Sequence, residues 1–329
     1  MPRSIILLDS TVIDSAWRAA ELPSVVVSPG GAIRFLRNDS TVSYFPPLNG
    51  ETLALRVPIK SARWSGHAKA IAVYRDSLVG YLGVDGRSVA VVDISTGRTL
   101  WSALLLGEAF GLQLSPDGVY VASIDQDSAF IRRVVQANTR VVGEIRLPAS
   151  YEKHATLGSV VSNYLFHVDR QAVMWMFPGD ARMFFSYPSL TEGRLYIPPL
   201  RRMGTVALEE ADSSTIVTKA LRGKISLPQF FGVLSDSTAL ILYRDSTAVP
   251  KDGAAWIYYG VVAHTRRSQV CLDVTLPQLT ARSASFALHS DTLEVLAGPV
   301  MNSPSSTLTR LRYRIDVKAC TWLGVQPGM

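Results

Sequence analysis

Charge is scarce in this sequence. Only 18% of its 329 residues are charged, and its mean hydropathy is +0.18. Soluble domains usually have about 25% charged residues. A hydrophobic content of 47% excludes an intrinsically disordered chain and supplies a large core. We therefore expect part of the protein surface to be covered by another molecule.

Long basic runs are also absent, although the net charge is +6. The clearest clusters are the arginine pairs Arg132-Arg133, Arg201-Arg202 and Arg266-Arg267. A nucleic-acid binder should have a basic stripe interleaved with aromatic residues, so no nucleic-acid partner is predicted. A dispersed positive charge fits an acidic protein partner or an anionic membrane surface, or else simply solvated arginine.

Long apolar runs are missing as well. The N-terminal "MPRSIILLDSTVIDS" has a short apolar stretch before Asp9, whereas a signal peptide needs about 7–15 apolar residues and a membrane span about 20. We expect no transmembrane segment and no visible signal peptide. A place at the periphery of a membrane is predicted, with the periplasmic side slightly favoured over the cytoplasm.

Cysteine is limited to Cys271 and Cys320. A disulfide between them would indicate an oxidising compartment. Equivalent positions in adjacent repeats would instead lie beyond the roughly 7 Å limit on the Cα separation of a disulfide. Both alternatives stay open at this point.

Catalytic motifs are missing too. The sequence has no Gly-x-Ser-x-Gly, no His-Glu-x-x-His and no glycine-rich phosphate loop. Its five histidines are not spaced to place two imidazoles in one site, and Asp125 and Asp127 fit a turn better than a calcium loop. We therefore predict no catalytic residue, no cofactor and no metal ligand.

Strand-turn-strand patterns, in contrast, are abundant. "LQLSPDGVYVASI" from Leu112 to Ile124 predicts a hairpin, because Pro sets the first turn angle and Asp and Gly accept the remaining ones. Similar patterns recur in five other places, namely 25–37, 70–83, 164–177, 230–244 and 284–298. Two further strand-like stretches follow several of these hairpins.

Repeats of four strands every 40–55 residues or so are typical of a β-propeller. We predict an all-β, single-domain propeller over residues 1–329 with six four-stranded blades, or seven if the N-terminal stretch pairs with strands not recognised. The segment Ile5 to Leu8 is expected to pair with the last blade and close the ring. The six units are Ser24–Pro58, Lys69–Leu106, Gly111–Pro148, Leu157–Ile197, Gln229–Pro277 and Arg282–Leu323.

The chain resembles bacterial six-bladed β-propellers of the NHL and TolB-like kind, in which the "SPDG" turn at Ser115 to Gly118 is common. The resemblance covers nearly the whole chain but is architectural, and a fold does not determine a function. "VVDISTGRTLW" from Val91 to Trp101 is similar to a repeat of quinoprotein propellers. Because it occurs once, we interpret Trp101 as a packing residue.

Residues 201–228 interrupt the repeats and are predicted to form an insertion between blades 4 and 5. This insertion is either solvated or a docking segment. The aromatic stretches 173–188 and 256–262 fit strands packed on both faces, or alternatively anchors for a partner. The candidate partner-binding residues are Arg201, Arg202, Trp175, Phe177, Tyr258, Tyr259, Arg266 and Arg267.

These features favour a non-catalytic scaffold or protein-interaction module, as an accessory subunit that stabilises a larger complex, such as a membrane complex. One alternative is a metal-dependent lactonase or hydrolase with its site in the central channel. Another is a sensor that binds a small ligand there.

Overall fold

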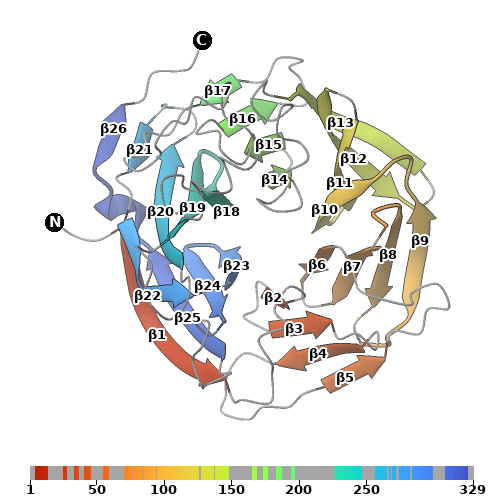
Figure 1. Cartoon of the computed structure of the whole chain (residues 1–329), viewed down its shortest axis with the longest axis horizontal. Coiled ribbons are helices and arrows are strands. Elements are labelled where there is room, and N and C mark those ends of the chain that lie inside the picture. The colour runs from red at the N-terminus through yellow and green to blue at the C-terminus, as the bar shows by residue number, and fades with distance from the viewer. Residues whose placement is uncertain are drawn as a thin grey trace. The chain divides into compact units, whose positions relative to one another are not determined.

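The computed structural model is almost entirely β-structure in the part of the chain that it describes (Figure 1). A short 3-10 helix, η3 (Val317–Ala319), lies near the C-terminus. The described residues are 4–13, 25–27, 33–36, 41–45, 55–58, 70–75, 77–83, 85–93, 95–125, 127–136, 138–147, 165–168, 173–176, 183–186, 194–196, 227–246, 256–264, 267, 269–271, 274–281, 284–298 and 308–324.

The chain forms two compact units. One unit combines Met1–Ala19 with Leu147–Met329, and the other is the continuous segment Ala20–Arg146. We call them the split unit and the continuous unit. The single-domain organisation over residues 1–329 stays a prediction.

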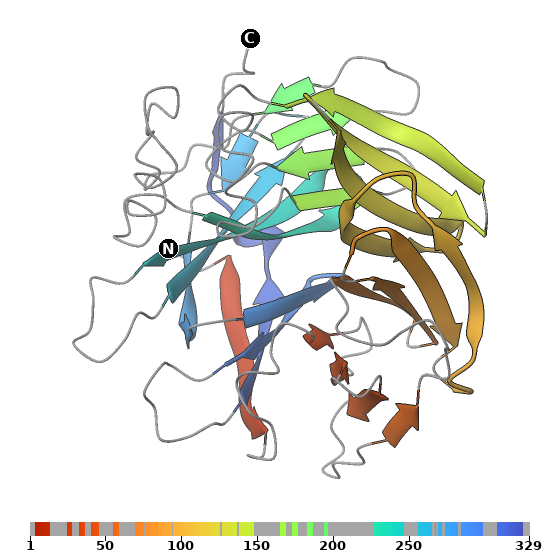
Figure 2. The same cartoon turned by 45° about the vertical axis from the view of Figure 1, so that its right-hand side comes forward.

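The continuous unit contains three antiparallel sheets, each with its strands in sequence order. The last two sheets lie side by side in orange and yellow (Figure 2). The strands are β2 (Val25–Val27), β3 (Ile33–Leu36), β4 (Thr41–Phe45) and β5 (Leu55–Pro58); β6 (Ala70–Tyr74), β7 (Leu78–Leu82), β8 (Ser88–Asp93) and β9 (Thr99–Leu104); and β10 (Ala109–Ser115), β11 (Gly118–Asp125), β12 (Ser128–Val135) and β13 (Asn138–Arg146).

The turn Ser115 to Gly118 shows how the sequence specifies such a sheet. Ser115 pairs with Gly118 across the hairpin, which leaves Pro116 and Asp117 as the turn. Gly118 has a φ of +148°, and a Cβ atom there would lie 3.1 Å from the carbonyl oxygen of Val134. Only glycine fits this position without strain.

The Asp117 side chain also stabilises the turn. Its carboxylate accepts a hydrogen bond of 2.7 Å from the Tyr120 hydroxyl. The backbone carbonyl oxygen of Asp117 accepts another, also of 2.7 Å, from Arg133 Nε. Burial opposes ionisation of Asp117, but hydrogen bonds from Tyr120 and Ser115 and the charge of Arg133 hold its pKa below the usual value. The aspartate therefore connects strands β11 and β12 to the turn.

Apolar side chains of the sheets β6–β9 and β10–β13 meet in one core. Its fully buried members share β-branched or aliphatic side chains, which suit a pleated surface: Leu82, Val89, Val91, Ala109, Val119, Val121 and Val134.

The split unit also contains three antiparallel sheets. The first has its strands in sequence order, and the other two incorporate strands from the ends of the chain. The strands are β14 (Leu165–Val168), β15 (Val173–Met176), β16 (Met183–Ser186) and β17 (Arg194–Tyr196); β18 (Leu227–Ser235), β19 (Thr238–Ser246), β20 (Trp256–His264), β21 (Gln269–Cys271), β22 (Val274–Ala281) and β26 (Trp322–Gly324); and β1 (Ile5–Ile13), β25 (Leu308–Ile315), β24 (Thr292–Ala297) and β23 (Ala284–His289).

The sheet around β19 and β20 is buried on both faces. On one face, Leu240 and Tyr258 pack with Leu293 and Tyr313 of the sheet β1–β25–β24–β23. On the other, Tyr243 packs in a cluster with the methionines of β15. Alternate residues of a strand point to opposite faces, so these strands are apolar throughout.

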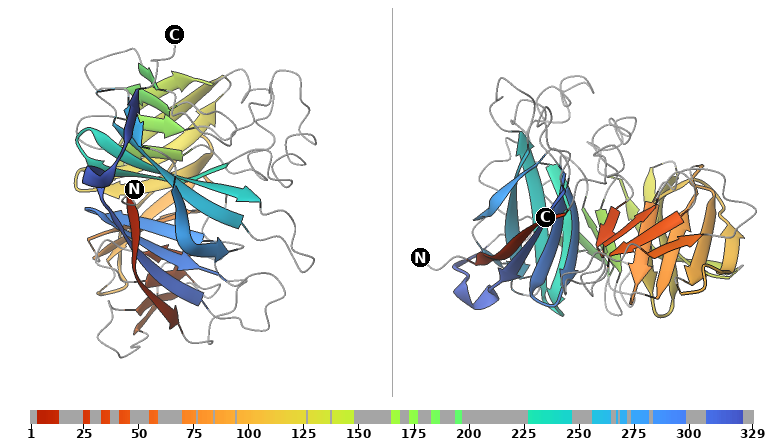
Figure 3. Two further views of the ribbon diagram at one scale, coloured as in Figure 1. Left: turned by 90° about the vertical axis from the view of Figure 1, so that its left-hand side faces the viewer. Right: turned by 90° about the horizontal axis from the view of Figure 1, so that it is seen from below.

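The N-terminal strand β1 pairs with β25, as predicted for Ile5 to Leu8. Ile5 lies opposite Ile315 and Ile13 opposite Leu308, with an irregularity between Leu7 and Asp9. β1 is thus the outer strand of the last sheet, and Figure 3 shows it in red along the blue strands. This pairing is confirmed, whereas the closure of the sheets into one ring stays a prediction.

The C-terminal segment departs from the predicted repeat. After β25 the chain passes through η3 and enters the neighbouring sheet, where β26 pairs with β21. The predicted blade Arg282–Leu323 is therefore wrong at its end, because Leu323 lies opposite Val270, which belongs to the preceding predicted blade. That preceding sheet has six strands, not four.

A disulfide joins Cys271 to Cys320, with a Cα separation of 5.2 Å. Equivalent positions in separate blades would be too far apart for a disulfide. Because the chain crosses between sheets, Cys320 lies just before β26, and β26 pairs with β21, the strand that contains Cys271.

All six predicted hairpins are present, in the pairs β2–β3, β6–β7, β10–β11, β14–β15, β18–β19 and β23–β24. Among the described sheets, four are regular meanders of four consecutive strands. The prediction of six such blades is therefore correct only for these four. The two remaining sheets each include a strand from one end of the chain, β26 in one and β1 in the other.

Candidate functional site: an apolar outer strand

The outer strand β9 of the continuous unit exposes large apolar side chains. Leu100 is 54% exposed, Leu104 77% and Leu106, just after the strand, 83%. They alternate with Trp101, Ala103 and Leu105, which pack against the core of the unit. The side chains on one face of β9 therefore pack against the core, and the leucines on the other face are exposed to solvent. We call Leu100, Leu104 and Leu106 the leucine strip.

The turn before β9 fixes the start of the strip. The Asp93 carboxylate accepts hydrogen bonds from Ser95 Oγ at 2.6 Å and from the Thr96 backbone N–H at 2.9 Å. The bond from Ser95, followed by those from Thr96, lowers the pKa of Asp93. Gly97 completes the turn with a φ of +66°. The Asp-x-x-Thr-Gly pattern therefore serves a tight turn here, and Trp101 is a packing residue, as predicted.

One edge of β9 has no neighbouring strand among the described residues, since β9 ends the order β6-β7-β8-β9. The Leu105 N–H donates to the Arg87 carbonyl oxygen at 2.8 Å, so the backbone N–H of Leu105 points toward the β8 side of β9. In an antiparallel ladder the direction of these groups alternates along the strand. The N–H and C=O groups of Ser102 and Leu104 therefore point away from the sheet.

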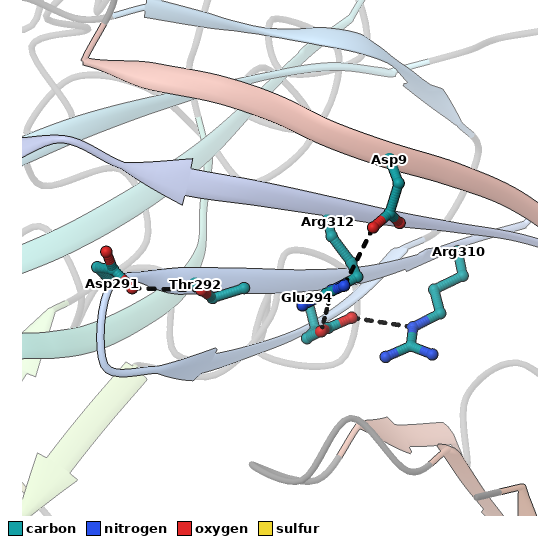
Figure 4. Close-up of polar contacts among 6 residues, drawn as sticks. All are labelled: Asp9, Asp291, Thr292, Glu294, Arg310 and Arg312. Atoms are coloured by element: carbon teal, nitrogen blue, oxygen red, sulfur yellow. Dashed lines mark hydrogen bonds and ion pairs between the residues drawn. The ribbon is translucent and has the colours of Figure 1, made fainter. Parts of the chain in front are cut away.

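A second cluster contains buried charges and lies on the strands β1, β24 and β25 (Figure 4). Glu294 Oε2 lies 2.9 Å from Arg310 Nε, and Glu294 Oε1 lies 2.9 Å from Arg312 Nε. Arg312 Nη1 in turn lies 3.1 Å from Asp9 Oδ2. Two acids and two bases thus neutralise one another across three adjacent strands.

This charge cluster acts on structure. Burial alone would lower the pKa of Arg312, but the negative charges of Glu294 and Asp9 raise it instead. Both partners of the Glu294–Arg310 pair have side chains that are only 6% exposed. A buried pair of this kind requires both partners, and here it links β24 to β25. The more exposed pair of Asp9 and Arg312 extends the cluster to β1.

The structure places three of the predicted partner-binding residues in the core. Trp175 is 1% exposed, Tyr258 1% and Tyr259 3%. Tyr258 and Tyr259 pack in the cores on the two faces of their sheet. All three side chains are too buried to contact a partner, so for them the packing interpretation replaces the anchor interpretation. Their position follows from strands that are covered on both faces.

The other predicted residues divide into two groups. Arg267 is described and exposed, between β20 and β21. Phe177, Arg201, Arg202 and Arg266 lie outside the described residues, as does the predicted insertion 201–228 except for Leu227 and Pro228, which begin β18.

Sequence reasoning missed the leucine strip, although a signal was present. In "RTLWSALLLGE" the residues Leu100, Ser102, Leu104 and Leu106 occupy every second position. Both sets of alternating residues are mostly apolar, so the pattern alone does not tell which set faces the core.

Among the described residues, no group of three or more His, Cys, Asp and Glu side chains could hold a metal ion. Within the same part of the chain, the structure contains no helix with the length and apolarity to cross a membrane.

Comparisons with known proteins identify the fold. No protein-family model and no curated protein matches the sequence. Among solved structures, a putative exported protein from Bacteroides fragilis is 10% identical, with 94% of each chain covered and a TM-score of 0.56. The WD40 repeats of RRP9 are 12% identical, with 93% of this chain and 98% of that chain covered and a TM-score of 0.53. WD40 repeats form β-propellers, and the chain has an all-β propeller fold.

Proposed function

We propose that this protein is a non-catalytic β-propeller that binds other proteins within a larger assembly. Its role is that of an accessory subunit, in which a rigid set of sheets presents contact surfaces to its partners. A membrane-associated complex is the kind of assembly that we favour, with the protein attached peripherally.

The leucine strip carries this proposal. Monomeric soluble proteins tolerate scattered exposed leucines. Here two lie on one side of a single outer strand, and a third follows just after its end. The same strand has an unpaired edge among the described strands. An extended segment of another chain can add to such a sheet, because it hydrogen-bonds to the unpaired backbone groups and packs against the apolar side chains.

Finer features of the architecture are part of the proposal. We envisage one ring of the bacterial NHL or TolB-like kind, closed by β1. Further partner contacts are proposed at Arg267 and, outside the described residues, at Phe177, Arg201, Arg202 and Arg266. Arginines at these positions would pair with partner carboxylates.

The disulfide between Cys271 and Cys320 supports an oxidising compartment for this assembly. The periplasmic face of a membrane is such a compartment. Trapping free thiols with an alkylating reagent in intact cells, followed by mass measurement, tests this part. Alkylation of both cysteines in the native protein would contradict it.

Size separation of the native assembly tests the function. The native source is solubilised gently, and this chain is detected after separation, beside a variant in which Leu104 is replaced by Lys. We expect the wild-type protein in a species much larger than its own 35.9 kDa, and the variant to shift toward free protein. Wild-type protein that migrates alone near its own mass would contradict the proposal and direct attention to hydrolase assays.

A further inference from the structure

The last described strand, β26, is short and mostly exposed. It has three residues, of which Leu323 and Gly324 are exposed and Trp322 is half-buried. β26 lies outside β21 at the end of its sheet (Figure 1). Its pairing with β21 extends only from Cys271 opposite Trp322 to Gln269 opposite Gly324. Because so little of β26 is buried and its ladder is so short, its noncovalent attachment is weaker than that of the inner strands.

The segment between β25 and β26 is anchored at its first residue. The Asp316 N–H donates to the Ser4 carbonyl oxygen at 2.7 Å, beside the start of β1. The Asp316 carboxylate caps η3 by accepting a hydrogen bond of 3.1 Å from the Lys318 N–H. No residue of η3 is buried, although Val317 packs partly against the neighbouring core. Between this anchor and β26, the disulfide at Cys320 ties the chain to β21.

Trp322 adds a noncovalent contact to this tie. Its ring meets the His264 ring of β20 edge-on, with 5.7 Å between the ring centroids. It also packs, together with Cys320, against the core that contains Cys271. The disulfide keeps Trp322 close to this core, so the covalent bond and the noncovalent contact support each other.

We infer that the Cys271–Cys320 disulfide is a redox-controlled latch for residues 316–324. In the oxidised protein, the latch keeps β26 on the edge of β21. Reduction releases β26 and uncovers that edge, while the inner strands of the sheet stay folded. The latch lies in the split unit and does not depend on the leucine strip of the continuous unit.

The chemistry of opening is thiol–disulfide exchange with a dithiol reductant. Cys320 is half-buried and Cys271 is only 3% exposed, so the reductant attacks the sulfur of Cys320 and Cys271 leaves as the thiolate. The second thiol of the reductant then breaks the mixed disulfide. The protein gains two electrons and two protons and holds two thiols, and the reductant becomes a disulfide.

The remaining sheet has its own reasons to stay folded. β20 pairs with β19 over its whole length, and its residues Trp256 to Gly260 also pair with β22. Fully buried side chains of β19 and β20, such as Leu240 and Tyr258, pack against the neighbouring sheet. These contacts do not involve β26, so its release is a local opening of the structure.

Hydrogen exchange of the purified full chain, with and without dithiothreitol, tests the latch. The sequence has two cysteines, so the reductant acts on this disulfide alone. We expect the amides of residues 316–324 and of β21 to exchange at least about tenfold faster after reduction, and those of β19 and β24 to keep their rates. Unchanged rates in residues 316–324, or an equal increase in β19, would overturn the inference.

The double variant Cys271→Ala, Cys320→Ala is the matched control for the reductant. Its residues 316–324 should exchange as fast as those of the reduced wild-type protein, with or without dithiothreitol. Reoxidation of the reduced wild-type protein with oxidised glutathione should restore slow exchange, because a latch closes again. Fast exchange that persists after the disulfide has re-formed would contradict the latch.

Trp322→Ala separates the disulfide from the packing of β26. We expect this variant to exchange faster than the wild-type protein mainly in the reduced state, where Trp322 is left to hold β26 without the covalent bond. Leu323→Ala is the matched control, because the leucine is 40% exposed and its loss should change little in either state. Equal increases for Trp322→Ala in the oxidised and reduced states would show that packing alone holds β26, and would overturn the inference.

Discussion

The sheet edges of the two units differ in whether another strand of the chain covers them. In the split unit, β26 covers the edge of β21 and β1 covers the edge of β25, with a disulfide at the first and an ion-pair cluster at the second. In the continuous unit, β9 ends its sheet among the described strands and exposes its leucines. The split unit therefore uses these sheet edges for internal stability, and we propose that the continuous unit leaves the β9 edge for another chain.

The largest expected effect concerns the covered edge of β25. Replacing Glu294 by Gln would leave Arg310 and Arg312 without their shared carboxylate, and we expect the free energy of unfolding to fall by about 3–5 kcal/mol. Denaturant unfolding measures this loss. Asp9→Asn is the matched control, because its side chain is 42% exposed and should cost less than about 1 kcal/mol. Equal losses in both variants would contradict the buried role of Glu294.

The next effect compares two leucines. Leu240 in β19 is fully buried, so Leu240→Ala should lower the free energy of unfolding by about 2–5 kcal/mol. Leu104→Ala in β9 should change the monomer by no more than about 0.5 kcal/mol. Denaturant unfolding of both variants at low protein concentration gives the two values. A large loss at Leu104 would mean that the leucine strip belongs to a core and not to a surface.

Removing the disulfide should have a somewhat smaller effect. In Cys320→Ser the free energy of unfolding should fall by about 2–4 kcal/mol, because the link closes a loop of 49 residues in the unfolded chain. A reducing agent should produce the same loss in the wild-type protein and none in a variant that lacks both cysteines. A wild-type protein whose stability is insensitive to reduction would show that the disulfide contributes little to the free energy of unfolding.

The smallest effect lies at the Ser115–Gly118 turn of the continuous unit. Burial, together with the hydrogen bond to Asp117, raises the pKa of Tyr120 to about 12, against 10.0 in the unfolded chain. This contribution to stability is complete below pH 10 and is lost as the pH rises toward 12. We expect Tyr120→Phe to be less stable at pH 8 by no more than about 1 kcal/mol and to lose less stability between pH 10 and pH 12. Parallel pH profiles of unfolding for the two proteins would contradict this assignment.

The sequence by itself determined the local structure. Turn residues such as Pro116, Asp117 and Gly118 restrict the backbone so strongly that every predicted hairpin is present. The pairing of Ile5 to Leu8 with the last sheet also followed from the sequence, since a propeller needs a strand that closes its last blade.

Only the tertiary structure decided which side chains are covered. Trp175 and Tyr258 are buried and Leu104 is exposed, although all three lie in apolar strands. An alternating pattern defines two faces of a strand but does not show what packs against each face. Likewise, Cys271 and Cys320 meet because the chain crosses from one sheet to the next, and such long-range pairing depends on the packing of whole sheets, which no local pattern encodes.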